Sequence, residues 1–344
     1  MSFSEKILQW YAENKRELPW RSTRNPYNIW LSEIMLQQTR VAQGTPYYLK
    51  FIQNFPTVYD LAKADEEKVL KLWQGLGYYS RARNLHATAK TIVTQYNGKF
   101  PDTYEGLLKL KGVGDYTASA IASICFNAPE PVVDGNVYRV LGRYFGIDLA
   151  INEPKGIKYF KALAREVMDT KNSRDYNQGI MEFGAMQCAP KKPYCMYCPL
   201  RESCVALKEG KVQELPVKLK KTKVRNRYFN YIVPIDAHNN TILKQRVGKG
   251  IWQGLYEFPL LETDKEVGIK EIQENAATVL PYTFSEMYQY NEHKIVHKLS
   301  HQHLHTFFWV LKTDGILKEG IRLKKIEEYP VPILIADFIK TLKI

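Results

Sequence analysis

Apolar side chains in the first 207 residues recur at the three- and four-residue spacing of a helix with one buried face. The spacing is clearest in two runs, Ile29–Val41 and Leu61–Leu76. Prolines divide the pattern into segments of ordinary helix length, at positions 19, 26, 46, 56 and 101. We therefore predict an all-α domain over residues 1–207.

The hydrophobic period changes to two after residue 227, as expected for strands. Tyr228–Ile235 alternates in this way, His238–Asn240 supplies a turn, and Thr241–Arg246 returns as a second strand. His305–Leu311 is a further strand candidate, and Ile333–Leu342 has the pattern of a closing helix. The sequence thus predicts a separate α+β domain over residues 227–344.

Residues 208–226 join the two predicted domains and become strongly basic toward their end. The basic residues there and just beyond are Lys218, Lys220, Lys221, Lys223, Arg225 and Arg227. Helical periodicity has stopped in this stretch, which indicates an exposed interdomain linker. Two interpretations stay open, a merely solvated connector or a contact with a DNA backbone.

The formal net charge of +13 and the pI near 9.3 favour a polyanionic partner, with nucleic acid ahead of an anionic membrane. A soluble protein that is basic without such a partner is the alternative. Met1–Gln9 has no apolar stretch behind a basic start, and no run of about eighteen apolar residues occurs. We expect no membrane partner and a cytoplasmic, nucleoid-associated location.

Four of the five cysteines are clustered, and Cys125 stands alone. The cluster has the spacing Cys-x6-Cys-x2-Cys-x5-Cys and consists of Cys188, Cys195, Cys198 and Cys204. Thiols gathered in this way in a reducing compartment indicate a closed metal site before they indicate disulfides. The spacing alone does not choose between a tetrahedral zinc ion and an iron–sulfur cubane.

A Gly-Val-Gly turn at Gly112 and Gly114 joins two helical runs. Glycine permits positive φ and lets backbone N–H groups approach a phosphate closely. The helix that begins near Tyr116 adds the positive end of its dipole. The turn can therefore hold a DNA phosphate, although an ordinary structural turn between helices has the same appearance.

Two carboxyl groups are candidates for acid–base chemistry. Asp134 ends an apolar run and opens a helix, so it is either a simple N-cap or a carboxylate kept ionised by the dipole. Glu33 lies among apolar neighbours, so it is either a solvated helix residue or a buried acid with a raised pKa. One protonated and one ionised carboxyl group together suit cleavage through an oxocarbenium-like state.

The Gly-Val-Gly turn, the downstream Asp134 and the cysteine spacing together resemble the endonuclease III and MutY branch of base-excision enzymes. Three further stretches resemble the MutY type in particular: Leu18–Arg21, Ser32–Thr39 and Gly75–Arg83. The resemblance implies a helix-hairpin-helix fold, a [4Fe–4S] cluster on the four cysteines, and removal of adenine paired with 8-oxoguanine or guanine in double-stranded DNA by a monomer.

The resemblance also assigns roles in catalysis. It implies that Glu33 protonates the adenine ring, that Asp134 stabilises or traps the sugar cation, and that Asn136 positions them. Tyr116 lies where endonuclease III enzymes carry a Schiff-base lysine, so no lyase nucleophile is expected. The implied pocket for the extruded adenine consists of Arg16, Trp20, Arg21, Leu36 and Gln178.

The remaining implied contacts concern the DNA duplex and the lesion. Gln38 and Tyr78 match residues that wedge into the duplex. The second domain resembles a MutT/Nudix-like lesion-recognition domain. Gly250–Leu261 resembles its Nudix region, but the run of glutamates that follows in a metal-binding Nudix motif is missing, so the domain should bind without hydrolysing. Ser300 and His301 match its lesion loop, with Leu299 where the family more often has phenylalanine.

Two other functions compete with this one. An endonuclease III-like glycosylase/lyase for oxidised pyrimidines is disfavoured by Tyr116 and by the large second domain. A non-catalytic DNA-binding scaffold is disfavoured by the pair Glu33 and Asp134. The five histidines between residues 293 and 305 fit alternating strand positions better than a metal site.

Overall fold

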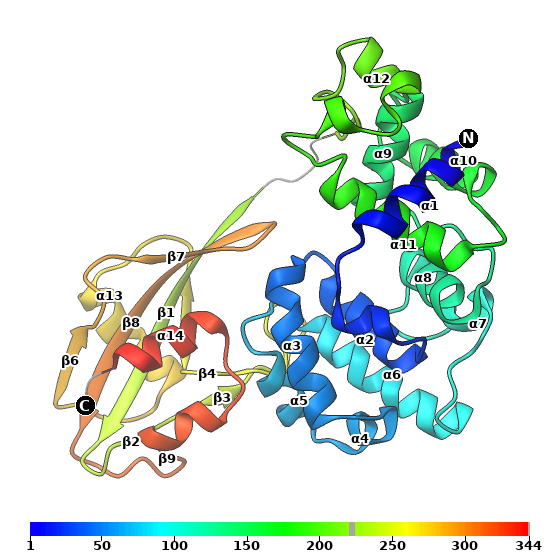
Figure 1. Ribbon diagram of the computed structural model, residues 1–344. Helices are drawn as coiled ribbons and strands as arrows, with labels where there is room; N and C mark the ends of the chain where they lie inside the picture. Colours follow the sequence, from blue (N-terminus) through cyan, green and yellow to red (C-terminus); the bar gives the residue numbers. More distant parts are fainter. Residues whose placement is uncertain (220–223, 343–344) are drawn as a thin grey trace. The chain divides into compact units, whose positions relative to one another are not determined.

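The computed structural model describes residues 1–219 and 224–342, which form two compact units (Figure 1). The first comprises Met1–Lys63 and Asn84–Lys220, and the second comprises Ala64–Arg83 and Lys221–Ile344. Lys220, Lys221 and Lys223 of the predicted linker lie outside the described residues. The fold class is the predicted one, a helical domain followed by an α+β domain.

The first unit is built of helices and short 3-10 turns. They are α1 (Phe3–Asn14), η1 (Pro19–Ser22), α2 (Pro26–Leu36), α3 (Val41–Asn54), α4 (Val58–Lys63), α6 (Ser80–Tyr96), α7 (Tyr104–Leu108), α8 (Asp115–Phe126), α9 (Gly135–Phe145), α10 (Pro154–Val167), α11 (Ser173–Met186), η2 (Cys195–Tyr197), η3 (Arg201–Ser203) and α12 (Val205–Lys208). Helix α6 begins in the second unit, which also holds α5 (Glu66–Trp73).

Helices α2, α8 and α11 form the centre of the first unit. Each buries most of its length, and α11 packs against α1, α8 and α9. The fully buried rings of Trp30, Tyr176 and Phe183 lie on two of these helices. A polar side chain on their inner faces is therefore surrounded by apolar atoms, which is the setting that shifts pKa values.

The second unit contains a sheet of five strands. Four of them have the order β5-β1-β8-β6, and the fifth, β7, also pairs with β8. Its elements are β1 (Arg225–Asp236), β2 (Asn240–Thr241), β3 (Lys244–Gln245), β4 (Tyr256–Glu257), β5 (Leu260–Thr263), α13 (Ile269–Val279), β6 (Glu286–Gln289), β7 (Ile295–Lys298), β8 (Gln302–Thr313), β9 (Ile321–Arg322), η4 (Leu323–Glu328) and α14 (Ile333–Thr341).

One helix covers each face of this sheet. Ile232 and Trp309, which are register partners in β1 and β8, share a buried cluster with Ile272 of α13. The neighbouring register pair, Tyr231 and Phe308, lies on the opposite face of the sheet. There the Phe308 ring stacks on the Phe338 ring of α14, with the ring centres 3.9 Å apart. The two long central strands are buried on both faces, so their apolar residues form nearly continuous runs.

The predicted hairpin of Tyr228–Ile235 with Thr241–Arg246 is wrong. Strand β1 pairs with β5 and, in parallel, with β8, while Thr241 pairs with β9 and Lys244–Gln245 pairs with β4. The Asp236 carboxylate accepts hydrogen bonds from the backbone N–H groups of His238, Asn240 and Leu317. This turn leads the chain out of the sheet, and the buried strand β8 takes the place beside β1.

Candidate active site

Glu33 lies on α2 with 7% of its surface exposed. The Tyr116 hydroxyl donates a hydrogen bond to Glu33 Oε2 at 2.7 Å and lies 3.3 Å from Met181 Sδ. The pKa of Glu33 is raised to about 7. Burial raises it most, the Tyr116 hydrogen bond opposes this, and the charges of Asp134 and Arg21 raise and lower it further. Of the two alternatives left open by the sequence, the glutamate is therefore the buried one, and its carboxyl group can hold a proton near neutral pH.

Asp134 is the N-cap of α9, as its position predicts. Its Oδ1 accepts the backbone N–H groups of Asn136 and Val137 at 2.9 and 2.8 Å, and Oδ2 accepts the Asn136 amide at 2.7 Å. These bonds stabilise the ionised form, although burial outweighs them and raises the pKa of Asp134. The second carboxyl group is thus fixed by its cap, and it lies near enough for its charge to raise the pKa of Glu33.

Arg139, which the sequence analysis missed, joins this carboxylate cap to the cysteine loop. Its guanidinium donates to Asn136 Oδ1 at 2.8 Å and to the Cys188 carbonyl oxygen at 2.8 Å. It lies one helical turn beyond Asn136, but the loop it reaches is 49 residues away along the chain. No local sequence signal could have shown this connection.

The four clustered cysteines line a single cavity near the end of α11. In the described part of the chain, no three His, Cys, Asp or Glu side chains form a group that could hold a metal ion. Four thiols that line one cavity are a donor set that either a tetrahedral zinc ion or an iron–sulfur cubane could use. Arg143 donates to the Ala189 carbonyl and reaches Cys188 Sγ at 3.4 Å.

Cys125 belongs to a different environment from the clustered thiols. It lies on α8, and burial raises its pKa to about 12. A thiol with so high a pKa is inert at neutral pH. It does not line the cysteine cavity.

Arg16 and Arg21, predicted to line the adenine pocket, meet at Glu182 of α11. The carboxylate accepts hydrogen bonds from Arg16 Nε and Nη2, both at 2.6 Å, and from Arg21 Nη1 and Nη2 at 3.1 and 2.8 Å. Trp20 and Gln178 are also buried, and Leu36 is half-buried. Glu182 was not expected from the sequence, because its neighbours along the chain do not indicate a contact with Arg16 or Arg21, which lie 166 and 161 positions earlier.

The two glycines of the turn before α8 have different roles. Gly112 has φ +79°, and a Cβ there would lie 2.8 Å from the side chain of Asn84. Gly114 has extended backbone as the N-cap of α8, with open space where a Cβ would be. Positive φ is therefore required at Gly112 alone, while Gly114 keeps the start of the helix accessible.

Gln38 and Tyr78, the predicted wedge residues, share an unusual backbone conformation. Their φ values are 54° and 48°, which non-glycine residues seldom adopt. Gln38 is exposed, and the Tyr78 ring is 46% exposed. Strain of this kind accumulates at functional sites, and both side chains are free to meet a ligand.

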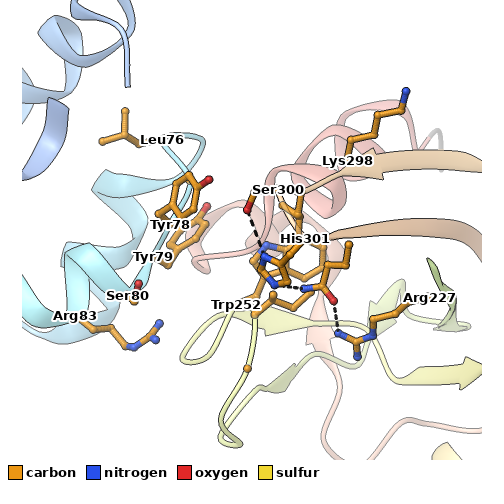
Figure 2. Close-up of a pocket in the computed structure, with 15 residues that line it drawn as sticks. Leu76, Tyr78, Tyr79, Ser80, Arg83, Arg227, Trp252, Lys298, Ser300 and His301 are labelled. Atoms are coloured by element: carbon orange, nitrogen blue, oxygen red, sulfur yellow. Dashed lines mark hydrogen bonds between the residues drawn. The ribbon is translucent and has the colours of Figure 1, made fainter. Parts of the chain in front are cut away.

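Ser300 and His301 line a cavity of about 570 Å³ in the second unit, together with Tyr78, Arg83 and Trp252 (Figure 2). Ser300 Oγ and His301 Nδ1 are 3.3 Å apart, and a chain of contacts continues through Gln302 to Arg227. Figure 2 shows Tyr78 and Tyr79 facing this loop across the cavity. Buried Trp252 has φ 60° and is a further lining residue that the sequence analysis missed.

None of the described helices is long and apolar enough to cross a membrane. Three of the five histidines between residues 293 and 305 lie in strands, His297 in β7 and His303 and His305 in β8. His303 and His305 occupy every second position of β8 and so share one face, as expected, while His297 pairs with Leu304 between them. The described histidines form no metal-binding group.

Known protein families match both halves of the chain. The HhH-GPD superfamily of base excision DNA repair proteins matches residues 31–166, and a NUDIX domain matches residues 230–341. The adenine DNA glycosylase of Buchnera aphidicola subsp. Acyrthosiphon pisum is 38% identical over 307 residues, which cover 88% of this chain and 84% of the relative. The Homo sapiens adenine DNA glycosylase is 42% identical over 223 residues, which cover 62% and 41%.

Solved structures agree with this relationship for the helical part. A thermostable thymine-DNA glycosylase has a TM-score of 0.56 and 32% identity, covering 60% of this chain and 95% of its own. An endonuclease III–DNA complex has the same fold, with a TM-score of 0.53 at 22% identity over 60% and 94% of the two chains. The chain therefore belongs to the adenine DNA glycosylases, which are enzymes of the HhH-GPD superfamily of base excision DNA repair proteins.

Proposed function

We propose that this enzyme hydrolyses the N-glycosidic bond of adenine paired with 8-oxoguanine or guanine in duplex DNA. The observation that carries the proposal is the pair of buried carboxyl groups in the first unit. Burial raises the pKa of Glu33 to about 7, while the Asp134 carboxylate is held in a cap of N–H donors. An acid and an anion side by side suit departure of a neutral base from a sugar cation.

In the proposed reaction, Glu33 donates its proton to a ring nitrogen of adenine. The C1′–N9 bond then breaks, and its electron pair stays on the protonated base, which leaves as neutral adenine. The positive charge that develops on the sugar is stabilised by the carboxylate of Asp134. Water adds to C1′ and gives its proton to the carboxylate of Glu33, which restores the acid, so the products are adenine and an intact abasic site.

Asn136 and Tyr116 have positioning roles in this proposal. The Asn136 amide holds Asp134 Oδ2, and the Tyr116 hydroxyl holds Glu33 Oε2, both at 2.7 Å. Tyr116 cannot form a Schiff base with the opened sugar, so the mechanism is hydrolysis without strand cleavage. This distinguishes the proposal from an endonuclease III-like lyase.

Adenine must leave the base stack before Glu33 can reach it. We propose that the extruded base lies among Arg16, Trp20, Arg21, Leu36 and Gln178, whose guanidinium and amide groups can hydrogen bond to its edges. Gln38 and Tyr78 would fill the space left in the duplex. The exposed start of α8 at Gly114 would hold a backbone phosphate through its N–H groups.

The second unit is the proposed reader of the base opposite adenine. 8-Oxoguanine differs from guanine by an N–H at position 7 and by a carbonyl at position 8. The Ser300 hydroxyl can accept the former, and Ser300 and His301 both line the cavity of the second unit. Because the catalytic carboxyl groups lie in the first unit, a separate reader of the opposite strand is needed.

Cys188, Cys195, Cys198 and Cys204 are proposed to hold a [4Fe–4S] cluster, which supplies a rigid cross-link for the loop when bound. The chemistry in the active site is carried by side chains of the protein. Arg139 donates hydrogen bonds both to Cys188 of this loop and to Asn136, so an ordered loop helps to hold Asn136 against Asp134. Lys191 and Lys192 in the same loop are exposed and can meet phosphates.

The test is single-turnover release of bases from duplexes that differ at one pair. We expect adenine to be released from 8-oxoguanine:adenine and more slowly from guanine:adenine, with none released from thymine:adenine. Release of an oxidised pyrimidine in place of adenine would instead support the endonuclease III-like alternative. Binding without release of any base would support the scaffold alternative.

A further inference from the structure

Glu182 is a buried carboxylate in the first unit that none of the proposed catalytic steps uses. Its side chain is 2% exposed, and five N–H groups converge on its two oxygens. One is the backbone N–H of Arg16, and the others belong to the guanidinium groups of Arg16 and Arg21. A buried carboxylate with this many donors holds both arginines in one geometry.

The two arginines are also tied to each other and to a ring. Arg21 Nη1 donates to the Arg16 carbonyl oxygen at 2.9 Å, and the Arg21 guanidinium lies 5.6 Å from the centre of the Tyr11 ring. Burial raises the pKa of Glu182, but the hydrogen bonds from Arg16 and Arg21 outweigh it and hold the value at about 2. The carboxylate is therefore ionised around neutral pH.

Glu182 also has an electrostatic relationship with the general acid. The charge of Arg21 acts on Glu33 and favours its ionised form. The other titratable groups facing Glu33 are Tyr116 and Cys125 on α8 and Asp134 at the start of α9. Without the Glu182 charge, the positive charge of Arg21 would be unneutralised near an acid that must keep its proton.

We propose that Glu182 is a positioning residue for adenine excision, which holds Arg16 and Arg21 in the base pocket and neutralises one of their charges beside Glu33. This inference rests on the proposed function. If Glu182 only linked α11 to the segment before α2, its loss would not change the pH dependence of base release. The proposed role predicts a change in both the rate and its pH dependence. Glu182 lies one helical turn from Gln178 on α11, so one helix supplies both residues to the pocket.

The test compares the full-length enzyme with Glu182→Gln and Glu182→Asp under single-turnover conditions on an 8-oxoguanine:adenine duplex. The glutamine keeps the shape and removes the charge, and the aspartate keeps the charge on a shorter side chain. Glu257→Gln is the matched control, because Glu257 is a buried carboxylate paired with Arg246 at 2.5 Å in the second unit. Affinity for a duplex with a tetrahydrofuran abasic analogue opposite 8-oxoguanine reports on folding and on DNA binding without the base.

We expect Glu182→Gln to slow adenine release roughly 10²-fold, the order expected when reacting groups are misplaced by about 1 Å. The pH above which its rate falls, the alkaline limb of the pH–rate profile, should move to lower pH, because unneutralised Arg21 lowers the pKa of Glu33. Glu182→Asp should be slower than wild type with the alkaline limb unmoved. Glu257→Gln should retain the wild-type rate, and all variants should bind the abasic analogue within about threefold of wild type, under 1 kcal/mol.

Two results would overturn the inference while the wild type still releases adenine. One is a Glu182→Gln rate within threefold of wild type. The other is a slower rate in both Glu182 variants with an unmoved alkaline limb and a matching loss of abasic-duplex affinity, which is the pattern of a structural tie alone. If Glu182→Gln does not fold, a wild-type rate for Glu182→Asp overturns the inference and a slower rate with intact abasic-duplex affinity supports it. A wild type that releases no adenine overturns the proposed function and this inference with it.

Discussion

The Tyr116 hydroxyl donates a hydrogen bond to Glu33 Oε2 over 2.7 Å, within a pocket where burial raises the pKa of that glutamate to about 7. The bond favours the ionised form, and burial favours the protonated form. Burial prevails, so the carboxyl group can hold a proton near neutral pH, as the proposed role of Glu33 as proton donor requires. The predictions for Glu33 and Tyr116 below follow from this hydrogen bond and from the burial of Glu33.

Glu33→Gln should abolish adenine release while sparing DNA binding, because the amide keeps the shape but donates no acidic proton. We expect a loss of at least 10²- to 10⁴-fold in the single-turnover rate. Asp134→Asn should also stop release through loss of the negative charge beside the sugar. If either variant retained a near-wild-type rate, the role given to that residue would be wrong.

The rate of adenine release should fall as pH rises through about 7, because the reaction needs protonated Glu33. Tyr116→Phe removes the hydrogen bond that favours the ionised form, so its alkaline limb should move to higher pH. The measurement is the single-turnover rate against pH for both proteins. An alkaline limb that moves to lower pH in Tyr116→Phe would contradict the electrostatic assignment.

Glu33 should also make the protein less stable at alkaline pH. Its folded-state pKa of about 7 lies above the ordinary value of 4.5, so its unfavourable effect is absent below pH 4.5 and complete above pH 7. Glu33→Gln removes a penalty of about 3 kcal/mol, at about 1.4 kcal/mol for each pKa unit. Denaturant unfolding should therefore show the variant to be more stable than wild type at pH 8 and similar to it at pH 4.5.

The protein should leave an abasic site without nicking the strand, because a tyrosine at position 116 supplies no amine for a Schiff base. Borohydride treatment during turnover should trap no protein–DNA adduct. An endonuclease III enzyme assayed on its own substrate serves as the positive control. Efficient trapping by this protein would show that another amine acts as a lyase nucleophile.

Purified protein should be yellow-brown and contain about four iron atoms per chain, as a four-thiolate cubane requires. Cys198→Ser should lose iron, because Cys198 lines the cysteine cavity. Cys125→Ser is the matched control and should retain it, since Cys125 lies elsewhere on α8. A colourless protein with one zinc ion per chain would disprove the cluster.

Changing Ser300 and His301 together to alanine should preserve some excision opposite guanine and abolish the preference for 8-oxoguanine. We expect the ratio of the two rates to fall at least tenfold, since hydrogen-bonded discrimination amounts to a few kcal/mol for each group. Iron content should not change. A Ser285→Ala, His293→Ala protein, altered at exposed positions outside the cavity, should keep the full preference.

Local patterns predicted well those features whose cause is also local. Asp134 was expected at a helix start, and its carboxylate caps α9. Glu33 was expected to have a raised pKa if buried, and its apolar neighbours on α2 do bury it. The hairpin after β1 was mispredicted, because a strand pattern and a turn do not show which strand pairs with β1, and β1 and β8 are both buried on two faces.

The sequence by itself determined the fold class, the cysteine spacing and the residue types of the candidate site, because helical periodicity, turn residues and ligand spacing act over a few neighbouring residues. Only the tertiary structure decided that Glu182 accepts hydrogen bonds from Arg16 and Arg21. The same holds for the hydrogen bonds through which Arg139 links Asn136 to Cys188, and for the pairing of β8 with β1. Each of these contacts joins residues dozens of positions apart. Such pairs form because a charge or a strand edge that the domain buries is costly unless it has a partner. Which groups are buried depends on the packing of the whole domain, so no local pattern predicts the pairs.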